Sequence, residues 1–254
     1  MRFSKLLQIS VCCLGLAACA SSSSSEYTED GIYDPFESYN RGVFAVNDAL
    51  DQAILKPVAT GYKKAVPEPV RDGAHNFLVN LRAPVNLANE LLQGDLDGAG
   101  KTVTRTLINT TVGVGGLFDV AGHEGMEYEH EDFGQTLAVW GVDHGPYVVI
   151  PLMGPSSFRD ATGLLVDSLA DPLRIYLFNV EKEGWHYARV GMTALDTRTE
   201  LLGSLEDLRK NSYDYYAAMR SSYYQYREAM VNDHDADKYE SPEIPDYDDD
   251  FSDL

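Results

Sequence analysis

The chain has 254 residues with 40 acidic and 20 basic side chains, so its formal net charge is −20. This length allows one or two domains with a sizeable core, and a hydrophobic share of 44% is that of a globular protein. The charge excludes nucleic acid as a ligand, because binding to a phosphate backbone depends on Lys and Arg that neutralise it.

Residues 1–18 are predicted to be a cleaved signal peptide. Arg2 and Lys5 precede an apolar stretch, residues 6–18, which is too short to cross about 30 Å of hydrocarbon as a helix. The stretch runs into Leu-Ala-Ala-Cys, which resembles the lipobox of bacterial lipoproteins. The resemblance implies that Cys19 is acylated on its sulfur and becomes the mature N-terminus. The alternative is an ordinary signal peptide with an incidental cysteine.

Residues 19–32 are predicted to be a lipidated, flexible linker. Cys12 and Cys13 leave with the signal, so the mature chain retains a single cysteine and forms no intramolecular disulfide. Ala20 stands where Asp would hold a lipoprotein of the enterobacterial type at the inner membrane, which implies sorting to the outer membrane. Acyl chains contribute about 0.8 kcal/mol per buried methylene, so two or three of them anchor a protein firmly.

Residues 33–231 are predicted to form one helical domain. Asp34 as N-cap, with Glu37 completing a capping box, predicts a helix over residues 34–54. Pro84 is expected to begin a later helix that ends at Gly94. Further helices are expected over these ranges: residues 67–81, 84–94, 95–112, 157–170, from 171 onward and, as one or two long helices, 185–230.

Two stretches interrupt the helical pattern, residues 113–122 (GVGGLFDVAG) and 140–151 (WGVDHGPYVVIP). Neither shows the sustained alternation of a strand, so the predicted fold class is all-α. The first stretch is either a tight loop or a segment that faces lipid or lines a passage, because glycine-rich apolar loops are unusual on a soluble surface. Its candidate residues are Gly113, Gly115, Gly116 and Phe118.

The C-terminal region is rich in tyrosine and then in acid. The tyrosines between residues 213 and 226 either pack a long helix or form a stacking or membrane-interface surface. From Asp233 to the end there are ten acidic residues and one lysine, a net charge of −9. Such a stretch repels itself and has little to bury, so residues 232–254 are predicted to be a disordered acidic tail.

Signals for catalysis or metal binding are weak. The spacing of four candidate ligands fits no standard zinc motif, and an acidic surface loop explains them better: His123, Glu124, Glu127 and His130. A hydrolase would have to pair His144 with Ser156 or Ser157, and no nucleophile-elbow motif accompanies them. We therefore expect no metal, no cofactor apart from the acyl chains on Cys19, and no enzymatic activity.

Short motifs spread over about 200 residues resemble, in order and spacing, the VacJ/MlaA lipoproteins of the Gram-negative outer membrane. The motifs are residues 34–41 (DPFESYNR), 56–58 (KPV), 66–69 (VPEP), 92–95 (LQGD), 113–122 (GVGGLFDVAG), 133–137 (FGQTL), 145–148 (GPYV) and 196–198 (DTR). The resemblance implies a ring-like assembly of amphipathic helices around a central channel. It further implies that the protein removes misplaced phospholipid from the outer leaflet and passes it to a periplasmic carrier protein. This removal maintains the lipid asymmetry of the outer membrane. The resemblance also implies association with trimeric porins.

Two segments are predicted to be working parts of this channel. The first helix contributes residues that control access to the passage: Phe36, Tyr39, Val43, Phe44 and Asn47. Residues 141–146 are predicted to be a gating hairpin, because Gly and Pro permit unusual backbone angles: Gly141, Asp143, Gly145 and Pro146. The competing hypotheses are a membrane-tethered phospholipase and a structural porin adaptor.

Overall fold

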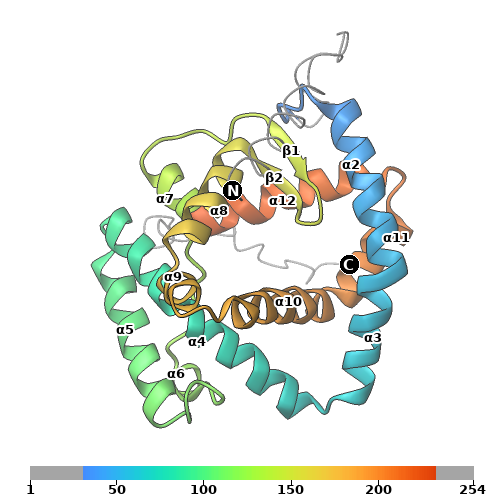
Figure 1. Cartoon of the computed structure of the whole chain (residues 1–254). Helices are drawn as coiled ribbons and strands as arrows, with labels where there is room; N and C mark the ends of the chain where they lie inside the picture. Colours follow the sequence, from blue (N-terminus) through green and yellow to red (C-terminus); the bar gives the residue numbers. More distant parts are fainter. Residues whose placement is uncertain (1–30, 233–254) are drawn as a thin grey trace, which may run out of the picture.

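The computed structural model describes residues 31–232 of the chain. The predicted signal peptide, Cys19, most of the linker and the acidic tail lie outside the described residues. The described part is mainly helical, with one antiparallel pair of short strands (Figure 1). The predicted helical class is therefore confirmed, and the small sheet is the departure from an all-α expectation.

The elements follow one another in this order: α2 (Glu37–Leu50), the π-helical turn η2 (Asp51–Leu55), α3 (Lys56–Ala65), α4 (Glu68–Gln93), α5 (Leu96–Thr111), α6 (Val120–His123), α7 (Phe133–Val139), β1 (Tyr147–Ile150), β2 (Gly154–Ser157), α8 (Phe158–Ala170), α9 (Pro172–Asn179), α10 (Glu183–Glu200), α11 (Leu202–Asn211) and α12 (Tyr215–Asn232). The segment α2–η2–α3 is continuous, so the first predicted helix extends past residue 54.

Several helices begin where a side chain caps them, as the sequence predicts. The Asp95 carboxylate accepts a hydrogen bond from the Gly98 amide at 3.0 Å and starts α5. The Ser157 hydroxyl oxygen accepts one from the Asp160 amide at 3.1 Å and starts α8. Such caps satisfy amides that have no partner within the helix, so they mark helix starts from local sequence alone.

Two predicted helix starts are wrong. The N-cap of α2 is Phe36, and Asp34 instead lies buried with its carboxylate paired to distant residues. Pro84 lies inside α4, which runs on to the left-handed Gly94. Proline normally interrupts a helix interior; here α4 packs along α5 and α7, and tertiary contacts override the local preference.

The C-terminal region forms three helices where one or two were predicted. Leu201 separates α10 from α11, and Ser212 has an extended backbone between α11 and α12. The Asp214 carboxylate accepts hydrogen bonds from the amides of Tyr216 at 3.0 Å and Ala217 at 3.2 Å. This aspartate restarts the helix, which lets α12 take a new direction.

The two strands form a hairpin held by α2. Tyr147 pairs with Ser157 and Ile150 pairs with Gly154 in antiparallel register. The buried Asn40 amide donates to the Tyr147 carbonyl at 3.0 Å, and its oxygen accepts from the Val149 amide at 3.0 Å. The outer edge of β1 is thus satisfied by a side chain of α2, so a two-stranded sheet suffices here.

The elements contact one another in a closed circuit. The hairpin joins α2 to α8, α8 packs on α9, α9 on α10, α10 on α3, and the turn η2 returns from α3 to α2. In Figure 1 α10 crosses the middle of the molecule, while α5 lies at the left-hand side against α4 and α6 packs on α5. A small aromatic core occupies the hairpin end: Tyr147, Val149 and Tyr216, with Val43, Phe44, Tyr223 and Tyr224 packed on it.

Candidate functional site

The described residues invert the usual distribution of polarity. Buried polar and charged residues outnumber buried apolar ones, and many large apolar side chains are exposed. The buried charged residues are Asp34, Glu90, Arg105, Glu131, Arg159, Asp171, Asp196, Arg198, Arg220 and Arg227. Charged groups are rarely buried in water-soluble proteins unless paired. The candidate functional site is therefore an apolar outer surface together with a polar, hydrogen-bonded interior.

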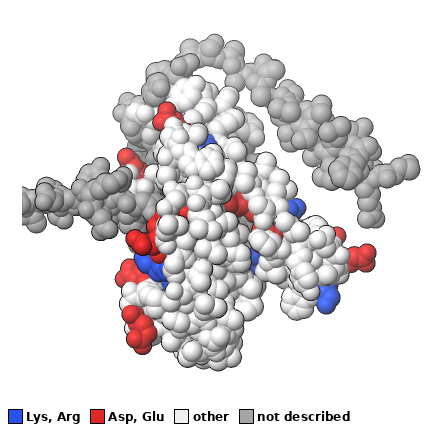
Figure 2. Space-filling view, turned by 90° about the vertical axis from the view of Figure 1, so that its left-hand side faces the viewer, with Lys and Arg blue, Asp and Glu red and all other residues white. Residues whose placement is uncertain are grey.

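Helix α5 shows this inversion residue by residue. Its inner side buries Arg105 and Asn109, which both donate hydrogen bonds to the Asp119 carboxylate, the Arg105 pair at 3.0 and 3.1 Å. Its outer side is apolar and exposed. Together with exposed apolar residues of α4 and of the loop after α5 it forms a surface that we call the apolar flank: Leu91, Leu92, Leu96, Val103, Leu107, Val112, Val114, Leu117 and Phe118. Figure 2 shows that the left-hand side of the molecule, where α5 lies, carries few charged residues.

The glycine-rich segment after α5 continues the apolar flank. Val114, Gly115 and Gly116 have positive φ angles of 54°, 74° and 92°, and Val114 and Phe118 are about two-thirds exposed at 62% and 63%. A Cβ on Gly113 would lie 2.3 Å from the Phe118 carbonyl oxygen, so only glycine fits there. The segment is thus a tight loop that presents apolar side chains outward. Its contact with lipid stays a prediction.

The first helix brings the predicted access residues to the hairpin. Phe36 lies 6.3 Å from the Phe158 ring, Val43 and Phe44 pack on the aromatic core, and Tyr39 is exposed. The Asn47 amide donates to the Ile150 carbonyl at 2.9 Å, and its oxygen accepts from the Leu152 amide at 2.8 Å. Asn47 therefore holds the hairpin turn through two hydrogen bonds. The access role of these residues stays a prediction.

The predicted hairpin position needs correction. Residues 141–146 form a turn and an extended lead into β1, and the hairpin itself spans residues 147–157. Gly141 and Gly145 do adopt positive φ angles of 85° and 65°. At the hairpin turn, Leu152 also has a positive φ of 67° and is 77% exposed. The signal available in the sequence was the β-prone Tyr-Val-Val-Ile segment followed by the Pro-Leu-Met-Gly turn, whereas the second strand, Gly-Pro-Ser-Ser, has no strand propensity.

The C-terminal tyrosines divide between packing and exposure. Tyr216 is buried, and its ring lies 6.1 Å from that of Tyr147. Tyr223 and Tyr224 lie 6.0 Å from the same ring, while Tyr213 and Tyr226 are exposed. Burial raises the pKa of Tyr224 to about 12. Tyr216, Tyr223 and Tyr224 therefore belong to the core, as the packing interpretation expects.

A buried charge network locks α12 to α7 and α8. The Arg227 guanidinium donates two hydrogen bonds to each of two carboxylates. The bonds to Asp132 are 2.6 and 3.0 Å long, and both bonds to Asp160 are 3.0 Å long. Burial by itself would raise the pKa of Asp132, but the hydrogen bonds and charge of Arg227 lower it to about 2. Both carboxylates are thus ionised at neutral pH, and bidentate pairing is the geometry that makes such burial tolerable.

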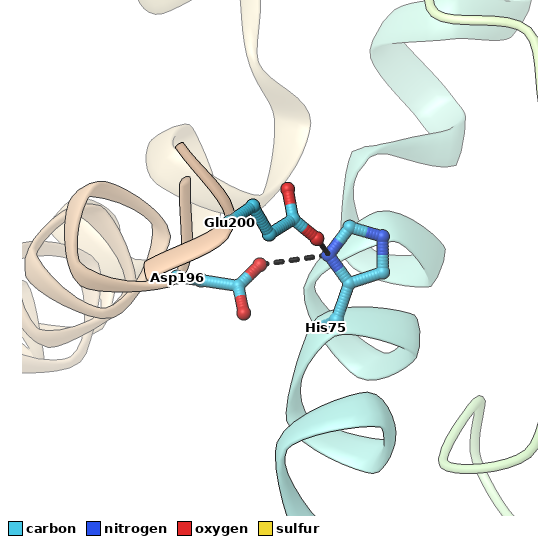
Figure 3. Close-up of side chains that lie close together, drawn as sticks. All are labelled: His75, Asp196 and Glu200. Carbon is cyan, nitrogen blue, oxygen red and sulfur yellow. Dashed lines mark hydrogen bonds and ion pairs between the residues drawn. The ribbon is translucent and has the colours of Figure 1, made fainter. Parts of the chain in front are cut away.

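A polar cavity of about 480 Å³ lies where α3, α4 and α10 meet. All of its lining side chains are polar, and six of the nine are charged: Lys63, Glu68, Arg71, Asp72, His75, Asn76, Asp196, Thr199 and Glu200. Figure 3 shows His75 of α4 facing Asp196 and Glu200 of α10. The His75 Nδ1 lies 2.7 Å from the Asp196 carboxylate and 3.1 Å from that of Glu200. Sequence reasoning missed this cluster, because its members lie 121 residues apart.

The candidates for metal binding and hydrolysis named from the sequence do not assemble. His123 is exposed on α6 with its Nδ1 2.6 Å from the Asp119 carbonyl oxygen, and His130 lies against Tyr128. Burial and Arg82 lower the pKa of His130 to about 3. Within residues 31–232, no hydrogen bond joins His144 to Ser156 or Ser157, whose hydroxyl groups make backbone contacts instead.

These features define a class of protein. A helical chain with ion pairs and amides inside and a broad apolar flank outside has the surface of a protein that lies against lipid or a protein partner. No helix among residues 31–232 combines the length and apolarity needed to cross a bilayer.

Comparison with known proteins identifies the family. The family model of the MlaA lipoprotein matches residues 32–230. The "Intermembrane phospholipid transport system lipoprotein MlaA" of Escherichia coli strain K12 is 32% identical, with 98% of each chain covered. A Rickettsia felis protein is 40% identical over 79% of this chain and 78% of its own. The chain belongs to the MlaA lipoprotein family.

A solved structure shares the fold. This structure belongs to work on the "Structural basis for maintenance of bacterial outer membrane lipid asymmetry". It superposes on the present chain with a TM-score of 0.68, and the two sequences are 36% identical. The match covers 78% of this chain and 99% of the solved one. The resemblance found in the sequence motifs is therefore confirmed by the fold.

Proposed function

We propose that this protein removes misplaced phospholipid from the outer leaflet of the outer membrane and passes it, chemically unchanged, to a periplasmic carrier. The observation that carries the proposal is the inverted polarity of the domain, with the apolar flank outside and charged groups inside. Its relatives are named as lipoproteins of an intermembrane phospholipid transport system, which supports the same function and an envelope location.

The physical requirement for such a protein is a sheltered path. A phospholipid carries about 30 methylenes, so its transfer into water costs on the order of 20 kcal/mol at about 0.8 kcal/mol each. The apolar flank would lie among acyl chains, and the closed circuit of elements would surround a passage whose polar wall accepts the head group. No bond in the lipid needs to break for this transfer.

The remaining parts of the proposal concern anchoring and partners. Acyl chains on Cys19 would hold the domain on the periplasmic side of the outer membrane, and a trimeric porin would supply the full-depth span beside it. Phe36, Tyr39, Val43, Phe44 and Asn47 would control access to the passage. The contact between Asn47 and the hairpin turn supports this role, because it couples the first helix to a segment that reaches the surface at Leu152.

The proposal is tested by following a labelled phospholipid. Vesicles containing lipid labelled in head group and acyl chain are incubated with the full chain and a soluble lipid acceptor. Transport predicts intact lipid on the acceptor, hydrolysis predicts free fatty acid, and a structural adaptor predicts neither. Release of fatty acid or failure to move lipid would overturn the proposal.

The apolar flank offers a matched pair of variants for the same assay. Val114→Asp with Phe118→Asp places charge at two exposed positions of the flank, so folding is preserved while insertion among acyl chains becomes unfavourable. Tyr213→Asp places charge at an exposed position outside the flank and serves as control. We expect the first variant to transfer lipid at least tenfold more slowly and the control to match the unaltered chain.

A further inference from the structure

The His75–Asp196–Glu200 cluster has the composition of a metal site. Its three ligating atoms, one imidazole nitrogen and two carboxylate oxygens, all lie within 4.8 Å of one another. His75 comes from α4, while Asp196 and Glu200 stand one helical turn apart on α10 and point the same way (Figure 3). Two rigid helices therefore present the three groups together.

The two carboxylates of the cluster share His75 as the ion-pair partner that the described residues give them. The two carboxylates lie side by side at i and i+4, where like charges repel. The Nδ1 of His75 carries at most one proton for the two acceptors beside it. Lys63 and Arg71 line the same cavity, yet within residues 31–232 neither forms an ion pair with Asp196 or Glu200. A divalent cation would satisfy both carboxylates at once.

We propose that His75, Asp196 and Glu200 bind one divalent transition-metal ion, with Zn²⁺ the best match to the donors. Zinc binds imidazole nitrogen and carboxylate oxygen at about 2.0–2.2 Å, so its ligand atoms stand roughly 3.3 Å apart in a tetrahedron. The two nitrogen–oxygen separations of 2.7 and 3.1 Å need only a small opening to reach this spacing, and the two carboxylate oxygens lie within 4.8 Å of each other. The imidazole disfavours Ca²⁺ and Mg²⁺, which take oxygen ligands.

All three residues line the 480 Å³ cavity, which has room for a water molecule as the fourth ligand. On binding, the Nδ1 lone pair must be free for the ion: a neutral ring takes the tautomer with its proton on Nε2, and a protonated ring releases its Nδ1 proton to solvent. The ion then ties α4 to α10 at the wall of the polar cavity. This site is separate from lipid transfer, and its presence or absence does not decide the proposed function.

The test uses the full chain, purified in detergent with a tag free of histidine, stripped with a chelator and dialysed. Titration with ZnCl₂ is followed by calorimetry, and titration with Co²⁺ by its visible absorption. We expect one Zn²⁺ per chain, a four-coordinate Co²⁺ spectrum, and a higher melting temperature with Zn²⁺. Fewer than one bound ion per chain would overturn the proposal.

Three variants separate this site from adventitious binding. His75→Asn keeps an N–H donor near the Nδ1 position but removes the imidazole ligand, and Glu200→Gln changes a half-exposed side chain, so the fold tolerates it. Both are expected to bind Zn²⁺ at least tenfold more weakly. His123→Asn removes an exposed histidine elsewhere and should bind as the unaltered chain does. Equal binding in all three variants, or loss only in His123→Asn, would show that the ion binds elsewhere.

Discussion

The Asp34 carboxylate and the Arg220 guanidinium, 186 residues apart in the chain, form a 2.9 Å ion pair that is almost completely buried. The same carboxylate accepts hydrogen bonds from the Tyr216 hydroxyl at 2.6 Å and from Asn40 at 2.8 Å. The segment before α2 is thereby fastened to α12 at the hairpin end of the domain. A charge this deeply buried depends wholly on its partners.

Removing one member of this pair should destabilise the fold strongly. Asp34→Ala leaves the Arg220 guanidinium buried without its carboxylate, and we expect a loss of about 3–5 kcal/mol in the free energy of unfolding. Lys182→Met removes a charge from the exposed start of α10 and should change stability by less than about 0.5 kcal/mol. Denaturant unfolding in detergent measures both, and equal effects would contradict the role of the pair.

The Arg227 network predicts a stability that depends on acid. The pKa of Asp132 is lowered from its ordinary value of 3.8 to about 2 in the folded chain, so folding favours the ionised form. Its contribution, about 2 kcal/mol, is fully present above pH 4 and is lost as the pH falls toward 2. Arg227→Lys keeps the charge but loses the bidentate fork, so its pH dependence between 4 and 2 should be shallower. The free energy of unfolding is measured against pH for both proteins. The same pH dependence in Arg227→Lys and in the unaltered chain would refute the role of the bidentate pair with Asp132.

Asn47 should control the mobility of the hairpin turn. Asn47→Ala removes one donor and one acceptor from the turn, each worth about 1 kcal/mol. We expect the Leu152 amide to exchange its hydrogen at least tenfold faster, since about 1.4 kcal/mol corresponds to tenfold. Asn80→Ala breaks an exposed hydrogen bond to Thr110 and should leave that amide unaffected. Hydrogen-exchange mass spectrometry distinguishes the two results.

The predicted gate at residues 141–146 can be tested with a pair of glycines. Gly141 and Gly125 have nearly the same φ, 85° and 86°, and no atom lies within 4 Å of a Cβ built on either. Valine at each position therefore introduces the same backbone strain, about 1–2 kcal/mol. If the segment gates lipid, Gly141→Val raises outer-leaflet phospholipid at unchanged protein abundance, and Gly125→Val does not. Equal phospholipid levels in the two strains would reject the gate.

Local sequence predicted the features that neighbouring residues decide. Asp95 and Ser157 begin helices because their side chains reach amides three residues ahead. Gly94 ends α4 because it adopts the left-handed conformation. The helical class and the family motifs could be found in the same way, since they depend on spacing along the chain. Asp34 was predicted to be another cap, but its carboxylate pairs with Arg220 instead. Local sequence could not reveal this pair, because Arg220 lies 186 residues away.

The sequence by itself therefore determined the helical class, the family and several helix boundaries, such as those of α5 and α8. Lipid attachment at Cys19 stays a prediction. Only the tertiary structure decided which charges are buried together, where the hairpin lies, and that His75 meets Asp196 and Glu200. The reason is physical. Caps and periodicity arise from hydrogen bonds and faces within a few residues. The buried ion pairs and the polar cavity join groups from different helices, which only packing brings within reach.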